Sequence, residues 1–469
     1  NRITVIQLAF DALPAALPGQ VFWPVRRFCR VDKVARISYN EISSLEENGG
    51  RVGPTDVTRK IDQAIEWGLG VVMFFLPISM PVVSVALICS VALWCGKLLL
   101  TRQVRWRRTP LDLPVCVFVL CGIVSILWGS PDKFFSLYNF GYLMGHYILT
   151  YCLITQNLTS YEQVKKLFRL LFLSASVTAA YGVYQYLYGG DISQYRWVDG
   201  DQFPDLRVRL YSTMENPNIY AGFLVIVIAL AVGMLLTITE RRKRLRYAVM
   251  ICGLSVCLTL TYSRGAWISF LGTLALLGVI RNTRLLWLLI IGPLLAIWIN
   301  PTLLERLTSI VNPTDTSSTL RLALWESSLA MLLEHPLTGI GWGAYWLVYP
   351  AYDFFINDGQ TTIYHAHNMF LNIGAELGFP GLLSFIWLLI SVMRLAVAAH
   401  RSCRNPGLCG AALGLVTAFT ALIINGLTDH VLFNIQMSIL LWALMAFTVV
   451  IHFAAPRNIP LQVDEKRQG

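Results

Sequence analysis

The chain has little charge and few of the residues that build metal or redox centres. Only 14% of its 469 residues are Asp, Glu, Lys or Arg, and seven are histidine. The ten cysteines show neither a Cys-x-x-Cys pair nor a Cys/His spacing typical of zinc sites, so the sequence implies no structural zinc and no disulfide. Internal repeats of 20 to 50 residues and low-complexity tracts are also missing. These absences exclude zinc-finger, disulfide-rich and solenoid proteins.

Apolar residues are abundant, making up 55% of the chain. They form runs long enough to cross a bilayer, and such runs recur along most of the sequence. The sequence therefore predicts an all-α integral membrane protein with about twelve transmembrane helices. The predicted spans are residues 64–79, 80–96, 112–129, 137–156, 167–188, 217–238, 247–262, 266–280, 285–300, 369–396, 411–427 and 434–454.

The net charge of +10 comes from basic clusters between the apolar runs, such as residues 241–246. The positive-inside rule explains these clusters better than nucleic-acid binding does, and it places the N-terminus in the cytoplasm. The predicted layout is a cytoplasmic extension (1–63), nine spans (64–300) with an outer loop at 189–216, a large outer loop (301–368), three spans (369–455) and a cytoplasmic tail (456–469).

Some basic residues fall on the outer side in this layout, which points to an anionic ligand there. They are Arg207, Arg209, Arg264, Arg306 and Arg321. Arg264 lies in a tight turn between two apolar runs, and Arg321 opens a segment with helical apolar spacing. A guanidinium matches phosphate oxygens bidentately, so two of them facing one pocket would suit a diphosphate. Snorkelling to lipid headgroups and a solvated helix face remain alternatives for these arginines.

Two of the seven histidines, His365 and His367, lie at the end of the large outer loop. Imidazole titrates near pH 6.5, so it can accept a proton from a hydroxyl group at neutral pH. Side chains two residues apart on a helix point away from each other, so only one of the two can face a pocket comfortably. Helix capping or a buried polar network is the alternative. No His-Glu-x-x-His pattern is present, and we predict no bound metal.

The same loop is rich in aromatic residues. These are Trp342, Tyr345, Trp346, Tyr349 and Tyr352. They fit an interfacial aromatic belt, and they also fit stacking on the rings of an acceptor sugar.

Several short motifs occur in a fixed order over roughly residues 205–385. They are Glu215-Asn216-Pro217-Asn218, Ser263-Arg264-Gly265, Arg321 with Trp325, His335-Pro336-Leu337-Thr338-Gly339-Ile340-Gly341-Trp342-Gly343, His365-Ala366-His367-Asn368 and Ala375-Glu376-Leu377-Gly378-Phe379-Pro380-Gly381. This order resembles the signature of the O-antigen ligase and polymerase superfamily, as does the layout of about twelve spans with one large outer loop.

The resemblance implies a glycosyltransferase of the bacterial inner membrane, with its active site on the periplasmic face. Its donor would be a glycan on undecaprenyl pyrophosphate, and its inverting chemistry would need neither metal nor cofactor. His367 matches the family's catalytic histidine, and Arg264 and Arg321 match the arginines that would hold the pyrophosphate. Further substrate contacts are expected at Arg207, Arg209, Asn216, Asn218, Trp325, His365, Asn368 and Glu376.

The acceptor distinguishes the branches of this superfamily. The motifs favour a ligase that transfers the glycan to a lipid A core. A polymerase that elongates lipid-linked glycan and an oligosaccharyltransferase that glycosylates proteins are the alternatives. A transporter of polyprenyl-linked glycans is the alternative from another class, but it would need polar or broken helices near the bilayer midplane. The expected partners are these glycans and membrane lipids, without nucleic acid.

Overall fold

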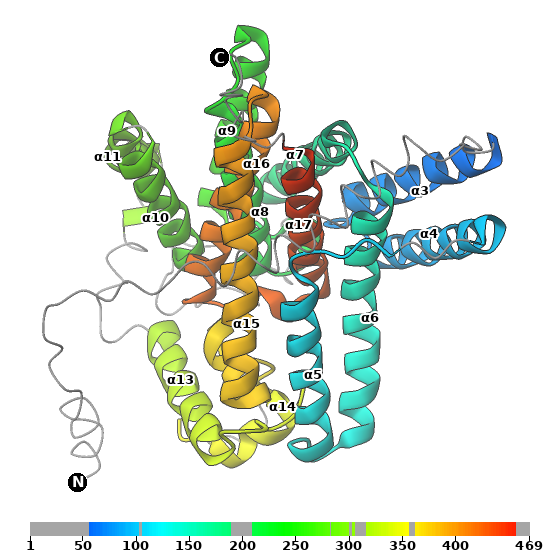
Figure 1. The fold of residues 1–469 in the computed structure, drawn as a ribbon. Coiled ribbons are helices and arrows are strands. Elements are labelled where there is room, and N and C mark those ends of the chain that lie inside the picture. The colour runs from blue at the N-terminus through cyan, green and yellow to red at the C-terminus, as the bar shows by residue number, and fades with distance from the viewer. Residues whose placement is uncertain are drawn as a thin grey trace, which may run out of the picture. The chain divides into compact units, whose positions relative to one another are not determined.

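The computed structural model describes residues 56–102, 106–188, 209–281, 283–299, 303–304, 316–355 and 362–455, and every regular element in these ranges is a helix (Figure 1). The predicted tail 456–469, most of the predicted extension 1–63 and most of the loop 189–216 lie outside the described residues.

The helices coincide with the apolar runs of the sequence. They are α3 (Asp56–Phe75), α4 (Met80–Thr101), α5 (Asp112–Trp128), α6 (Lys133–Asn157), α7 (Tyr161–Tyr188), α8 (Pro217–Leu235), α9 (Arg241–Leu260), α10 (Arg264–Ile280), α11 (Leu288–Ile299), α13 (Thr316–Glu334), α14 (Tyr345–Val348), α15 (Met369–Ser402), α16 (Pro406–Gly426) and α17 (Ile435–Ala454), with short 3-10 turns at Ser212–Met214, Thr283–Trp287, Tyr349–Tyr352 and Val431–Phe433. Each predicted span overlaps one of these helices, so the helical fold class is confirmed.

Six helices in the described ranges are long and apolar enough to cross a membrane: α4, α7, α8, α15, α16 and α17. Helices α5 and α10 and the stretch 283–298 are apolar but shorter. The count of twelve spans therefore stays a prediction, as does the sidedness of the loops.

The centre of the fold is the pair α8 and α16. Asn216 caps α8, its Oδ1 accepting hydrogen bonds from the backbone N–H groups of Asn218 and Ile219. Nearly all of α8 is buried. Its Gly233 lies so close to Gly414 of α16 that a Cβ would collide with the backbone there. Small residues at such a crossing let two helices approach closely, as in membrane helix pairs.

Helix α15, which overlaps the predicted span 369–396, is interrupted at Gly378. Gly378 has φ +69°, and Pro380 follows inside the helix. A Cβ at Gly378 would lie 2.7 Å from the carbonyl oxygen of Pro336, and the N–H of Phe379 donates to that oxygen at 2.8 Å. The motif at 375–381 thus packs against the motif that begins at His335. The close approach requires a positive φ at Gly378, which glycine adopts without strain.

The described part of the large loop contains helices α13 and α14, which lie at the same end of the bundle as the lower part of α15 (Figure 1). Tyr345 and Tyr349 are buried and stack on each other, with ring centroids 6.0 Å apart. Tyr345 also shares a hydrogen bond with Ser328 of α13. These two tyrosines therefore form the core of the loop, and the prediction of a belt or a sugar-stacking surface was wrong for them.

The structure also contains a disulfide, Cys403–Cys409, which the sequence interpretation did not expect. Cys403 directly follows the last residue of α15, and Cys409 lies in the first turn of α16. The tight connection between the helices brings their Cα atoms to 5.4 Å, within the usual range for a disulfide. The spacing of six residues resembles no recognised motif, so only the fold reveals the pair.

Candidate active site

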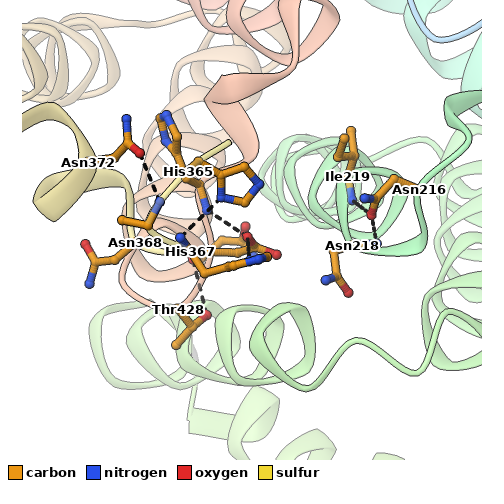
Figure 2. Close-up of polar contacts among 12 residues, drawn as sticks. Asn216, Asn218, Ile219, His365, His367, Asn368, Asn372 and Thr428 are labelled. Carbon is orange, nitrogen blue, oxygen red and sulfur yellow. Dashed lines mark hydrogen bonds and ion pairs between the residues drawn. The ribbon is translucent and has the colours of Figure 1, made fainter. Parts of the chain in front are cut away.

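The hairpin between α16 and α17, residues 427–434, meets the stretch 362–368 that leads into α15 (Figure 2). Asn368 fixes this meeting point. Its Oδ1 caps α15 by accepting from the N–H groups of Phe370 and Leu371, and its Nδ2 donates to the carbonyl oxygen of Leu427 at 2.9 Å. Asn368, predicted as a substrate contact, thus holds the preceding residue, His367, over the hairpin.

His367 pairs with a buried carboxylate. Its Nδ1 lies 2.9 Å from Oδ1 of Asp429, whose side chain is 10% exposed, whereas that of His367 is 29% exposed. The Asp429 oxygen also accepts the N–H of His430 at 2.8 Å. An Nδ1–H donated to Asp429 leaves Nε2 free to take a proton from a substrate. This is the arrangement of a general base with an orienting carboxylate.

The backbone at His367 is in the left-handed region, with φ +48°. Non-glycine residues adopt this conformation at an energetic cost, and they do so most often at functional sites. Two contacts hold it in place. Nε1 of Trp325 donates to the carbonyl oxygen of His367 at 3.4 Å, and the N–H of His367 donates to Nδ1 of His365 at 3.2 Å. Trp325 and His365 are therefore brought to the site, as supports of His367.

Burial controls the charges around His367. Burial alone would raise the pKa of the Asp429 carboxyl, but His367 and Arg321 hold it well below its usual range. Burial lowers the pKa of His430 to about 4, and burial together with His367 lowers the pKa of His365 well below 6.5. At neutral pH the site thus holds one carboxylate and two uncharged imidazoles beside His367. Arg321 is near enough to act on both Asp429 and His365.

Arg264 is the first residue of α10 and is buried, with 8% of its surface exposed. The next residue, Gly265, lies against the hairpin, where a Cβ would collide with Oγ1 of Thr428. The start of α10 therefore packs beside Asp429. The free N–H groups of a helix start attract anions, so Arg264 and this first turn together suit a phosphate group. The structure thus brings together the neighbourhoods of His367, Arg264 and Arg321.

The other predicted arginines and asparagines have structural partners or fall outside the described residues. Nη2 of Arg209 donates to Oδ1 of Asn218 at 2.7 Å, and its Nε donates to the carbonyl oxygen of Thr261 at 2.9 Å. Asn216 caps α8, as described above, and Figure 2 shows Asn216 and Asn218 on another element, set apart from His367. Arg207 and Arg306 lie outside the described residues.

Glu376 does not reach His367. Its Oε2 accepts the N–H of Gly343 at 3.0 Å and so holds the glycine-rich turn after His335. The side chain lines a cavity of about 540 Å³ that also borders His365 and His430.

Asp429 and His430 were missed by the sequence interpretation. The sequence did carry a signal for them, because Asp429 and His430 are two adjacent ionisable residues in a short hairpin between two apolar runs. An ionisable group that is buried in such a place needs a partner. The pairing of Asp429 with His367, 62 residues away, becomes visible only in the fold.

Three side chains here could hold a metal ion. The ligand atoms of His365, His367 and Asp429 lie within 4.8 Å of one another. A closed structural zinc site uses four ligands, and Asp429 is already paired with His367. The prediction of metal-independent chemistry is untested.

Comparison with known proteins gives one family. Residues 248–386 match the family model described as O-antigen ligase. This range contains Arg264, Arg321 and His367, and it ends before Asp429. A search of curated proteins found no match to the chain. The resemblance predicted from the motifs is thereby confirmed.

Proposed function

We propose that this protein is a glycosyltransferase that uses a lipid-linked donor, because its residues 248–386 match the O-antigen ligase family model and several of its helices are long and apolar enough to cross a membrane. It moves a glycan from undecaprenyl pyrophosphate to a sugar hydroxyl on the periplasmic face of the bacterial inner membrane. The observation that carries the proposal is the His367–Asp429 pair beside the start of α10.

The reaction is a single displacement. The acceptor hydroxyl gives its proton to Nε2 of His367 as its oxygen attacks the anomeric carbon of the donor sugar. The bond from that carbon to the pyrophosphate oxygen breaks, and undecaprenyl pyrophosphate leaves with the bonding electrons. Attack from the side opposite the leaving group inverts the anomeric centre. Asp429 stabilises the imidazolium that forms.

Arg264 and Arg321 bind the pyrophosphate and stabilise its growing negative charge, with the help of the first turn of α10. Permanent positive charge next to the leaving group does the work that a metal ion would otherwise do, so the chemistry runs without one. Among acceptors we propose the lipid A core, which makes the protein an O-antigen ligase.

The test is transfer by the purified full-length protein in lipid nanodiscs, with undecaprenyl-pyrophosphate-linked glycan as donor and lipid A core as acceptor. We expect the core to gain glycan with the wild type and none with His367→Ala. His335→Ala is the matched control, because this histidine lies in the same region of the chain but outside the pair, and it should keep wild-type activity.

Each other outcome points to a defined alternative. Elongation of lipid-linked glycan without the core would indicate a polymerase, and transfer to an added protein would indicate an oligosaccharyltransferase. Movement of donor across vesicle membranes, unaffected by His367→Ala and without any transfer, would contradict the proposal in favour of transport.

A further inference from the structure

Next to the His367–Asp429 pair lies the cavity of about 540 Å³, between α5, α6, α15, α17 and the segment around Trp342. Its size is that of a small-molecule site. Nine of its 23 lining residues are Phe, Tyr or Trp, and none is Lys or Arg. His365 and His430 form one part of its wall. Because the ring of His365 lies 4.3 Å from that of His367, this wall adjoins the proposed base.

The aromatic rings near the histidines form a continuous surface. Trp346 contacts Phe135 and Tyr364, with ring centroids 5.7 and 6.5 Å apart, and Tyr364 stacks on Phe433 at 6.3 Å. Tyr364 is 56% exposed and Phe433 is 44% exposed, so these two rings stand at the mouth of the cavity. Flat aromatic faces offer large rigid contact area to a ring-shaped ligand at little cost in conformational entropy.

Two buried polar atoms in the same wall have no hydrogen-bond partner in the described part of the chain. They are Oδ1 of Asn139 and Nδ1 of His430. Leaving such atoms unpaired is unfavourable, and a ligand that brings hydroxyl groups would satisfy them. A hydrocarbon chain would not. At these two atoms the cavity is suited to a ligand with hydroxyl groups, although aliphatic and aromatic side chains make up most of its lining.

The charges of its lining residues distinguish this cavity from the proposed donor site. Its lining contains the carboxylic acid of Glu376 and no cationic side chain of lysine or arginine, so a pyrophosphate finds no counter-charge there. Arg264 and Arg321, which would meet the pyrophosphate, are not in its wall.

We propose that this cavity is the acceptor site and that it takes an uncharged, hydroxyl-bearing sugar, whose reacting hydroxyl passes His365 to reach His367. The proposal rests on the transferase function above and adds the class of acceptor group to it: a terminal sugar without phosphate. The rings of Trp346 and Tyr364 hold the sugar faces, and Asn139 and His430 receive its hydroxyl groups.

Two pairs of variants test it in the full-length protein. Tyr364→Ala removes an exposed ring at the mouth, and Tyr138→Ala, a ring on α6 that is 70% exposed and outside the wall, is its control. Asn139→Ala removes one unpaired oxygen, and Asn157→Ala removes a similar unpaired oxygen at the other end of α6. We expect the first variant of each pair to raise the acceptor KM about tenfold, with donor KM unchanged, and the controls to behave like wild type.

A direct binding measurement makes the result independent of transfer. The probe is core oligosaccharide freed of lipid, with and without its phosphate groups, titrated against the protein while tryptophan fluorescence is followed. We expect the dephosphorylated probe to bind more tightly than the phosphorylated one, and Tyr364→Ala to weaken it about tenfold. Wild-type binding without transfer in the kinetic assay would refute the proposed function and leave the sugar site standing.

Three results would overturn the acceptor site. The first is a rise in donor KM in Tyr364→Ala or Asn139→Ala with acceptor KM unchanged. The second is displacement of the probe by undecaprenyl phosphate, which would assign the cavity to the donor's lipid. The third is equal binding by wild type and both variants.

Discussion

Replacing Asp429 by asparagine removes one negative charge and little volume, so it isolates what the carboxylate does for His367. The atoms Nδ1 and Oδ1 are 2.9 Å apart. At that separation and an effective dielectric constant of about 20, an imidazolium and a carboxylate attract each other by roughly 6 kcal/mol. His367 is 29% exposed and the amide can still form a hydrogen bond, so we expect about half of this to be lost.

A loss of about 3 to 4 kcal/mol in the transition state lowers kcat by about 10² to 10³. In the proposed mechanism Asp429 acts through His367 and does not meet the donor, so the donor KM should stay within about twofold. The assay is steady-state glycan transfer by the purified protein in nanodiscs. Asp353→Asn, which changes a loop carboxylate that accepts from Tyr349, is the matched control.

A double variant distinguishes positioning from general destabilisation. If Asp429 works only through His367, then His367→Gln combined with Asp429→Asn should be no slower than His367→Gln alone. Fully additive losses, or an Asp429→Asn protein with near-wild-type kcat, would refute the pairing as the source of catalysis.

Three further changes have defined outcomes. Arg264→Lys and, separately, Arg321→Lys lose a bidentate phosphate contact, so donor KM should rise about 10- to 100-fold in transfer assays while acceptor KM does not change. Gly378→Ala forces a side chain into φ +69° and onto the Pro336 carbonyl, so thermal unfolding should occur several degrees lower, whereas Gly145→Ala, where a Cβ meets open space, should have no such effect. His430, with its pKa lowered to about 4 in the folded protein, binds a proton more readily when unfolded; stability should therefore fall from pH 6.5 to pH 4 by up to about 3 kcal/mol, and a Tm–pH profile of His430→Asn should show a smaller fall.

The helices could be predicted from the sequence because apolar runs of spanning length specify them locally. Their ends were less exact, since the predicted span 411–427 begins five residues after α16 does, but the structure shows a capping asparagine at three helix starts: Asn216, Asn405 and Asn434. The break at Gly378 was not predicted. It depends on the close approach of Pro336, which lies about forty residues earlier in the chain and which no periodicity reveals.

The site was predictable only as far as single residues carry a chemical signal. His365 and His367 stand out because histidine is rare in this chain, and the outer arginines because they depart from the positive-inside bias; the family resemblance then singled out His367, Arg264 and Arg321. Asp429 carries the same kind of signal, but the function we propose for it depends on a partner 62 residues away. Glu376 and Asn218 are the opposite case. Their side chains are suited to binding a ligand, which is why the sequence predicted them as substrate contacts, but in the fold both have hydrogen-bond partners within the protein.

In the proposed mechanism, the difference in charge between the arginines and the aromatic cavity lets one site handle two amphiphilic substrates. The donor presents a diphosphate, and the acceptor presents hydroxyl groups close to the same base. We propose that the arginine at the start of α10 and the aromatic wall, which contains neither arginine nor lysine, sort these two substrates by charge before either reaches His367. A donor in the aromatic cavity would leave its pyrophosphate without a counter-charge, and a neutral sugar beside the arginines would gain no charge complementarity. Either misplacement therefore weakens binding. In the proposed mechanism this keeps the pyrophosphate and the attacking acceptor hydroxyl on opposite sides of the anomeric carbon, as an inverting displacement requires.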